Sequence, residues 1–92
     1  MARIISVTQD HIDQGIRWSC DANPLVLAAL DAGASAAWVD SSGRRIWVER
    51  GRWCYERRLP ASVEKWIAVY DLYSDGPKHC RPFDLDLDID EW

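Results

Sequence analysis

Long apolar runs are absent from this sequence of 92 residues, and no segment approaches the roughly 20 apolar residues that a membrane-spanning helix requires. Residues 1–6 contain neither the apolar stretch nor the cleavage site of a secretory signal peptide. Cysteine is scarce, and three cysteines at scattered positions do not form the disulfide framework of a small secreted domain. We therefore expect a soluble cytoplasmic protein with reduced thiols and no membrane contact.

The motifs of common enzyme and metal sites are absent as well. The chain contains no G-x-S-x-G elbow, no G-x-x-x-x-G-K-[ST] phosphate loop, no H-E-x-x-H and no G-x-G-x-x-G. A zinc site without a C-x-x-C pair would have to gather its ligands from distant segments. The spacing Asp84-x-Asp86-x-Asp88 matches the start of a calcium-binding EF-hand loop, but Ile89 stands where that loop needs glycine. We therefore expect a protein that is not an enzyme and that holds no cofactor or metal.

The overall composition is that of one small globular domain covering residues 1–92. Apolar residues make up 48% of the chain and charged residues 28%, which is far from the composition of a disordered protein. The six tryptophans are unusual for this length. Because a domain of this size buries only about 60 to 65% of the surface of its unfolded chain, we expect at least one indole to be partly exposed. The net charge of −4 argues against nonspecific binding of the whole molecule to nucleic acid.

Local patterns predict an α+β fold with a small mixed or antiparallel sheet of four to five strands, two main helices and one short helix. The clearest helix follows a capping residue, Asp21 or Asn23, and ends at Gly33. A later helix shows an apolar stripe at i, i+3, i+4 and i+7 from Val63. The expected elements are a strand at 3–8, a short helix at 11–15, a helix at 25–32, strands at 36–40, 45–49 and 52–57, a helix that opens at 59–62 and ends near 74–77, and a strand at 81–92.

The C-terminal segment alternates strictly between apolar and acidic residues over 83–90. This period of two predicts a strand whose apolar side chains face the core and whose carboxylates form one exposed row. Carboxylates about 6.6 Å apart along a strand can imitate the phosphates of a nucleic acid and occupy a basic groove on a protein. Alternatively, the charges protect a terminal edge strand from aggregation. The residues of this acidic candidate site are Asp84, Asp86, Asp88, Asp90 and Glu91.

A second candidate site is the basic and aromatic stretch 44–58, which contains six arginines and two glutamates. Arginine and aromatic side chains on a hairpin are typical of platforms for single-stranded nucleic acid and also of hot spots in protein interfaces. In a third interpretation, the arginines pair with the aspartate row while the tryptophans pack under the helix that opens at 59–62. The residues of this basic candidate site are Arg45, Trp47, Arg50, Arg52 and Trp53.

The segments VTQDHIDQG, SCDANPLVLA, LPASVEKWIAVYD and RPFDLDLD are distributed over the whole chain. In this pattern the chain resembles small proteins encoded by bacteriophages and prophages. Proteins of that group often have Cys-x-x-Cys-Pro where this sequence has Cys20-Asp21-Ala22-Asn23-Pro24, and this difference weakens any shared metal or redox role. The resemblance implies a stoichiometric inhibitor of a host defence system, in the manner of anti-CRISPR proteins.

Three functions are compatible with the sequence. The first is a phage or prophage protein that binds and blocks a host protein or nucleoprotein complex, with the acidic site imitating phosphates. The second is a nucleic-acid-binding accessory module that uses the basic site. The third is a self-associating structural protein, for which exposed tryptophans and an edge strand make a homodimer a reasonable form.

Overall fold

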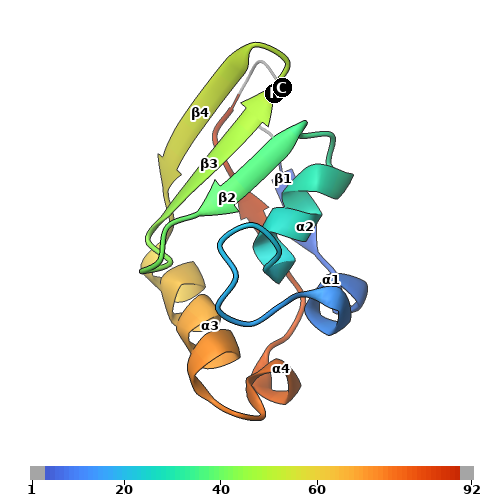
Figure 1. Ribbon diagram of the computed structural model, residues 1–92, viewed down its shortest axis with the longest axis vertical. Helices are drawn as coiled ribbons and strands as arrows, with labels where there is room; N and C mark the ends of the chain where they lie inside the picture. Colours follow the sequence, from blue (N-terminus) through green and yellow to red (C-terminus); the bar gives the residue numbers. More distant parts are fainter. Residues whose placement is uncertain (1–3, 90–92) are drawn as a thin grey trace.

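The computed structural model describes residues 4–89, which fold into short helices and strands (Figure 1). The elements in chain order are β1 (Ile4–Val7), α1 (Gln9–Gln14), α2 (Pro24–Asp31), β2 (Ala36–Val39), β3 (Arg45–Arg50), β4 (Trp53–Arg58), α3 (Ala61–Leu72), α4 (Gly76–His79) and β5 (Phe83–Asp86). The predicted α+β class is confirmed, and the strands pair antiparallel in two sheets, whereas one mixed or antiparallel sheet of four to five strands was expected. Within residues 4–89, no helix has the length and apolar character needed to cross a membrane.

The strands are divided between two antiparallel sheets. One sheet is a meander of β2, β3 and β4, whereas the other pairs β1 with β5 from the opposite end of the sequence. Gly43 and Gly51 lie in the two turns of the meander with φ angles of 70° and 60°. Glycine adopts such positive φ angles without a steric penalty, and this explains the tight connections between these strands.

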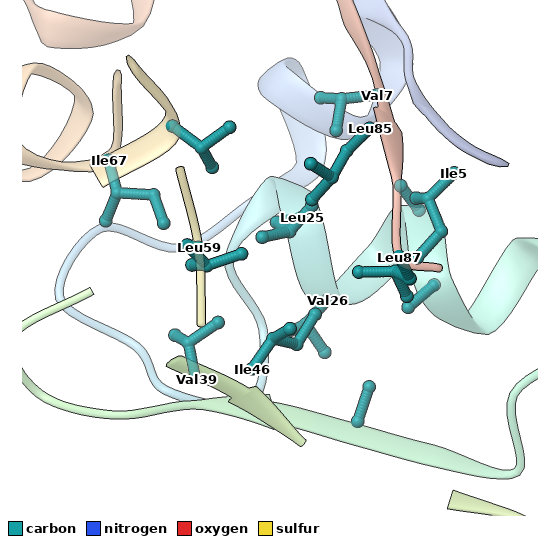
Figure 2. Packing of buried hydrophobic residues seen from close by; sticks show 14 of the residues in the cluster. Ile5, Val7, Leu25, Val26, Val39, Ile46, Leu59, Ile67, Leu85 and Leu87 are labelled. Atoms are coloured by element: carbon teal, nitrogen blue, oxygen red, sulfur yellow. The ribbon is translucent and has the colours of Figure 1, made fainter. Parts of the chain in front are cut away.

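The two sheets share a core in which α2 lies between them (Figure 2). Val39 and Ile46 point from the meander toward Val26 of α2, while Ile5 and Leu85 approach α2 from the two-stranded sheet. These five side chains are at most 6% exposed. Burial of one aliphatic side chain contributes about 1.5–3 kcal/mol, and this shared cluster therefore holds both sheets to the helix. Because side chains alternate along a strand, the opposite face of each sheet points away from the core.

Capping residues explain where the first two helices begin. The N–H of Thr8 donates to Nδ1 of His11, and the Thr8 hydroxyl accepts from the N–H of His11, so Thr8 caps α1, which begins at Gln9. Asn23 Oδ1 accepts from the N–H of Val26 at 2.9 Å. Of the two predicted caps for α2, Asn23 is therefore the one that acts.

The predicted C-terminal strand is correct at its start but too long. β5 ends at Asp86, which is opposite Ile4 of β1. The N–H of Asp88 donates to Oδ1 of Asp86 at 2.8 Å, and Asp88 has a φ angle of 54°, which extended strands do not adopt. Leu87 and Ile89 are nevertheless buried. The alternation of apolar and acidic residues thus correctly predicts which side chains are buried, but the strand itself is shorter than the alternating segment.

The helix α4 was not predicted, since the sequence around 74–77 was expected only to end the preceding helix. α3 does end there, and α4 packs against its last turn. A Cβ atom on Gly76 would lie 2.3 Å from the carbonyl oxygen of Val69 and 2.6 Å from that of Tyr70. Only glycine permits this close approach of two backbones.

Candidate binding surfaces

An open groove runs beside β1, between this strand and the helices α1 and α2, with a volume of about 530 Å³. We call it the acidic groove, because two carboxyl side chains line it, Asp10 from α1 and Asp31 from α2. Among residues 4–89, no lysine or arginine lines this groove. The lining residues are Ile4, Ser6, Thr8, Asp10, His11, Ala28, Asp31 and Ala32.

Two aspartates of β5 extend this negative surface. Asp84 and Asp86 are opposite Ser6 and Ile4, which themselves line the acidic groove. Side chains directly opposite in an antiparallel pair lie on the same face, with Cβ atoms about 4.5–5.5 Å apart. The carboxylates of three separate elements therefore meet on one side of the molecule. We call this set the acidic face: Asp10, Asp31, Asp84 and Asp86.

His11 holds Asp31 in place within the acidic groove. Nε2 of His11 lies 2.5 Å from Oδ2 of Asp31, while Nδ1 accepts from the N–H of Thr8 at 2.9 Å. The ring proton is therefore on Nε2, and this nitrogen donates to the carboxylate. Both ring nitrogens of His11 are therefore engaged within the protein. The arrangement links α1 to α2 and orients one carboxylate.

The residues of the predicted acidic site do not form the straight row that the sequence suggested. Asp84 and Asp86 are exposed on β5, as expected. Asp88 is exposed too, but the change of backbone direction at this residue takes it off the strand. Arg57 donates to the carbonyl oxygens of Leu87 and Asp88, not to the carboxylates. The remaining members, Asp90 and Glu91, lie outside the described residues.

The outer face of the meander carries the second surface, which we call the tryptophan face. Its centre is Trp38 of β2 opposite Trp47 of β3, with ring centroids 6.2 Å apart and an interplanar angle of 8°. Charged side chains surround this pair on the same face. The other members from β3 and β4 are Arg45, Glu49, Cys54, Glu56 and Arg58.

The strand register divides the predicted basic site between different surfaces. Arg45 and Trp47 belong to the tryptophan face, but Arg50 is opposite Trp53 and alternates onto the other side of the sheet. Arg52 lies in the turn before β4. Arg50 also donates to the carbonyl oxygen of Gly33 at 2.6 Å.

Trp38 is the surface residue that the sequence reasoning missed. It lies on β2, and only the pairing of Trp38 with Trp47 shows that the two indoles belong together. Strand alternation alone indicates the face of a residue within its own strand. It does not reveal which residue of the neighbouring strand is opposite.

The arginine ion pairs within residues 4–89 join glutamates, not the aspartates of β5. Arg44 pairs with Glu64 at 3.2 Å, and Arg45 pairs with Glu56. Nor does Trp53 pack under α3, because it is 59% exposed. Trp18 is 63% exposed, so the expectation of partly exposed indoles is confirmed.

No cluster of three or more potential metal-binding side chains is found within the part of the chain that the structure describes. Cys20 and Cys54 are exposed free thiols, whereas Cys80 is buried. Comparison with protein-family models, with curated proteins and with solved structures finds no match to this chain. The two surfaces themselves are therefore the basis for any functional inference.

Proposed function

We propose that this chain is a non-catalytic binding protein whose acidic face occupies a basic, nucleic-acid-binding surface of a partner protein. The observation that carries the proposal is an open groove lined by Asp10 of α1 and Asp31 of α2, with Asp84 and Asp86 of β5 opposite two of its lining residues and with no lysine or arginine among the lining residues that the structure describes. Like charges on one side of a small domain repel one another. A cationic partner relieves that repulsion, and the free energy gained favours the complex.

The spacing of the carboxylates supports mimicry of a nucleic acid. Asp84 and Asp86 are two residues apart on an extended strand, a separation of about 6.6 Å, which is similar to the distance between successive phosphates. Asp31 is fixed by His11 through one carboxylate oxygen, so less side-chain freedom is lost when an arginine binds it. Carboxylates also match guanidinium groups in bidentate geometry.

The resemblance to phage and prophage proteins indicates which partners to test first. A nucleoprotein effector of a bacterial defence system has a basic channel that normally holds nucleic acid. An acidic inhibitor in the host cytoplasm would compete for that channel. We therefore propose a stoichiometric inhibitor of such a complex, similar in action to anti-CRISPR proteins.

The test is an affinity capture from lysate of a bacterium with active CRISPR and other defence systems, followed by competition with nucleic acid. The double variant Asp84→Lys, Asp86→Lys should bind the partner with an affinity at least about tenfold lower, because two attractive contacts become repulsive. Asp21→Lys with Asp75→Lys is the matched control, since it changes the net charge equally at exposed positions outside the groove lining. Equal capture by both double variants would contradict the proposal.

The alternative of a nucleic-acid-binding module would use the tryptophan face. On that face, Arg45 and Arg58 are balanced by Glu49 and Glu56, so it carries no net positive charge. Binding of phosphates depends on an excess of lysine and arginine. The charge balance thus favours a protein over a nucleic acid as the partner of this face. Titration with a labelled single strand at two salt concentrations tests the alternative, which requires binding at low salt.

A further inference from the structure

The outer edge of β5 has no partner strand. β5 pairs with β1 along one edge only, and these two strands form a sheet by themselves. In an antiparallel pair, alternate residues of each strand direct their N–H and C=O groups away from the partner. Within residues 4–89, the backbone of Phe83–Asp86 makes no hydrogen bond to any element other than β1. This edge therefore offers donors and acceptors to an additional strand.

An apolar cleft of about 290 Å³ lies between β5 and the first two turns of α3. Val63 and Trp66 line it from α3, while Phe83 and Leu85 line it from β5. The rings of Trp66 and Phe83 meet edge to face, with centroids 5.1 Å apart. Leu85 also extends into the core near α2, so the cleft borders the core (Figure 2). The other lining residues are Pro60, Ser62 and Asp84. Since no described residue of β1 lines the cleft, it lies on the side of β5 that has no partner strand.

The exposed side chains of β5 determine which charge an added strand must carry. Asp84 and Asp86 are exposed, and neither forms an ion pair within the residues that the structure describes. Arg57 donates to backbone carbonyls just after the strand and not to these carboxylates. Opposite charges on directly opposite residues stabilise a pair of strands, whereas like charges destabilise it. The edge thus favours lysine or arginine opposite its aspartates, and it disfavours a second copy of β5, whose aspartates would lie on the same face.

We propose that an extended segment of a partner protein, in which lysine or arginine alternates with apolar residues, adds to the outer edge of β5 as a third strand. Its backbone bonds to the unpaired groups of Phe83–Asp86, as in other cases of strand addition. Its basic side chains lie opposite Asp84 and Asp86 on the exposed face. Because side chains alternate along a strand, the apolar side chain between them points to the other face and enters the cleft beside α3.

This site shares Asp84 and Asp86 with the acidic face, but it does not include the acidic groove. The groove is lined by β1 and by no described residue of β5, whereas the cleft is lined by β5 and by no described residue of β1. Strand addition also requires no nucleic-acid-binding activity of the partner. The site is therefore a separate interaction surface, and it can be tested without a nucleic-acid-binding protein.

A short synthetic peptide that alternates lysine with valine and phenylalanine is the probe. In amide NMR titrations it should shift the resonances of Phe83–Asp86 and of the first turns of α3, with a dissociation constant of about 0.1–1 mM. A peptide of the same composition, with its lysines and its apolar residues in two separate blocks, should bind at least about tenfold more weakly. It cannot present the charges on one face and the apolar anchor on the other.

Methylation of alternate backbone nitrogens of the peptide tests strand addition directly. Methyl groups on the set of nitrogens that faces β5 remove the donors and should weaken binding at least about tenfold, whereas methyl groups on the other set face solvent and should be tolerated. Equal affinities of the two methylated peptides would contradict strand addition. Shifts that are absent at about 2 mM alternating peptide, or confined to β1 and α2, would contradict it as well.

Ser62→Phe tests the cleft. Ser62 is exposed and lines the cleft, so a phenylalanine ring at this position should occupy the space and weaken binding of the alternating peptide at least about tenfold. Ala61→Phe is the matched control, because Ala61 is exposed in the same turn but lies outside the lining. Wild-type affinity in Ser62→Phe would overturn the proposal. If Ser62→Phe does not fold, the two methylated peptides decide on the wild-type protein. Failure of these titrations leaves the capture experiment on the acidic face unaffected, and failure of that capture leaves strand addition unaffected.

Discussion

At the scale of single residues, Asp40 fixes the turn between β2 and β3. Its Oδ1 accepts from the N–H of Arg44 at 2.7 Å, and its Oδ2 accepts from the hydroxyl of Ser42 at 2.9 Å. Partial burial acts to raise the pKa of Asp40, but the donors from Arg44, Ser42 and Arg45 outweigh it and hold this pKa below its ordinary value. The ionised carboxylate is therefore the form that stabilises the turn.

Removing this carboxylate should make the protein less stable in a pH-dependent way. Because the folded-state pKa is lowered, the stabilisation is complete above the ordinary value of 3.8 and is lost as the pH falls through the lower folded-state value. Asp40→Ala should reduce the free energy of unfolding by about 1 kcal/mol at neutral pH, with a smaller difference at about pH 2.5. Urea unfolding at both pH values measures this. A difference that stays constant between them would show that the carboxylate charge is not responsible.

At the scale of elements, a tyrosine and an arginine fasten the N-terminal third of the chain to α3. The Tyr70 hydroxyl donates to the carbonyl oxygen of Ile12 in α1 at 2.9 Å. Arg17, in the loop after α1, donates to the carbonyl oxygens of Tyr70 and Asp71 at 3.0 and 2.6 Å. These carbonyls belong to the last turn of α3, where the helix itself supplies no partners. The loop before α2 therefore completes the end of α3.

Loss of the Tyr70 hydroxyl should uncouple α1 from α3 without disturbing the packing of the ring. Tyr70→Phe keeps the stacking on Trp66, whose ring centroid is 5.6 Å away, but leaves the buried Ile12 carbonyl without its donor. We expect the free energy of unfolding to fall by about 1–2 kcal/mol in denaturant titrations. Tyr73→Phe is the control, because Tyr73 is 59% exposed and should change little. Equal effects of the two substitutions would mean that the hydrogen bond to α1 contributes nothing.

The elements also show how far local sequence can predict this molecule. The start of α2 at Pro24 and the three strands of the meander follow from caps, turn glycines and alternation, which are all local signals. The pairing of β5 with β1 does not follow from local signals. β1 lies at the other end of the sequence, and several strands could have paired with β5. For the same reason the groove beside β1 and the contact of Trp38 with Trp47 could not be predicted. The sequence did identify Asp84 and Asp86 of the acidic face and Trp47 of the tryptophan face.

At the scale of the whole molecule, the two surfaces belong to different layers around one core. The acidic face is carried by the two-stranded sheet and by α1 and α2, while the tryptophan face is the outer side of the meander. Ile5 and Ile46, from the two sheets, contribute to the same buried cluster. Substitutions on one surface should therefore leave the other intact, as long as the shared core remains folded.

The reactivity of the three thiols reports how often the shared core opens. Cys20 and Cys54 are exposed, whereas Cys80 is 6% exposed and its Sγ donates to the carbonyl oxygen of Trp66 at 3.7 Å. Burial raises the pKa of the Cys80 thiol, and this lowers the fraction of reactive thiolate still further. Cys80 should react only when the core opens.

A thiol-reactive chromophore added to the native protein should therefore modify Cys20 and Cys54 quickly and Cys80 at least about a thousandfold more slowly. In denaturant all three should react at similar rates, because burial no longer distinguishes them. Cys80→Ala is the matched variant, and it should remove the slow phase while leaving the fast phases unchanged. If a slow phase persists in Cys80→Ala, the protected thiol is Cys20 or Cys54 and not Cys80. Three equal rates in the native protein would show that the segment around Cys80 opens independently of the core.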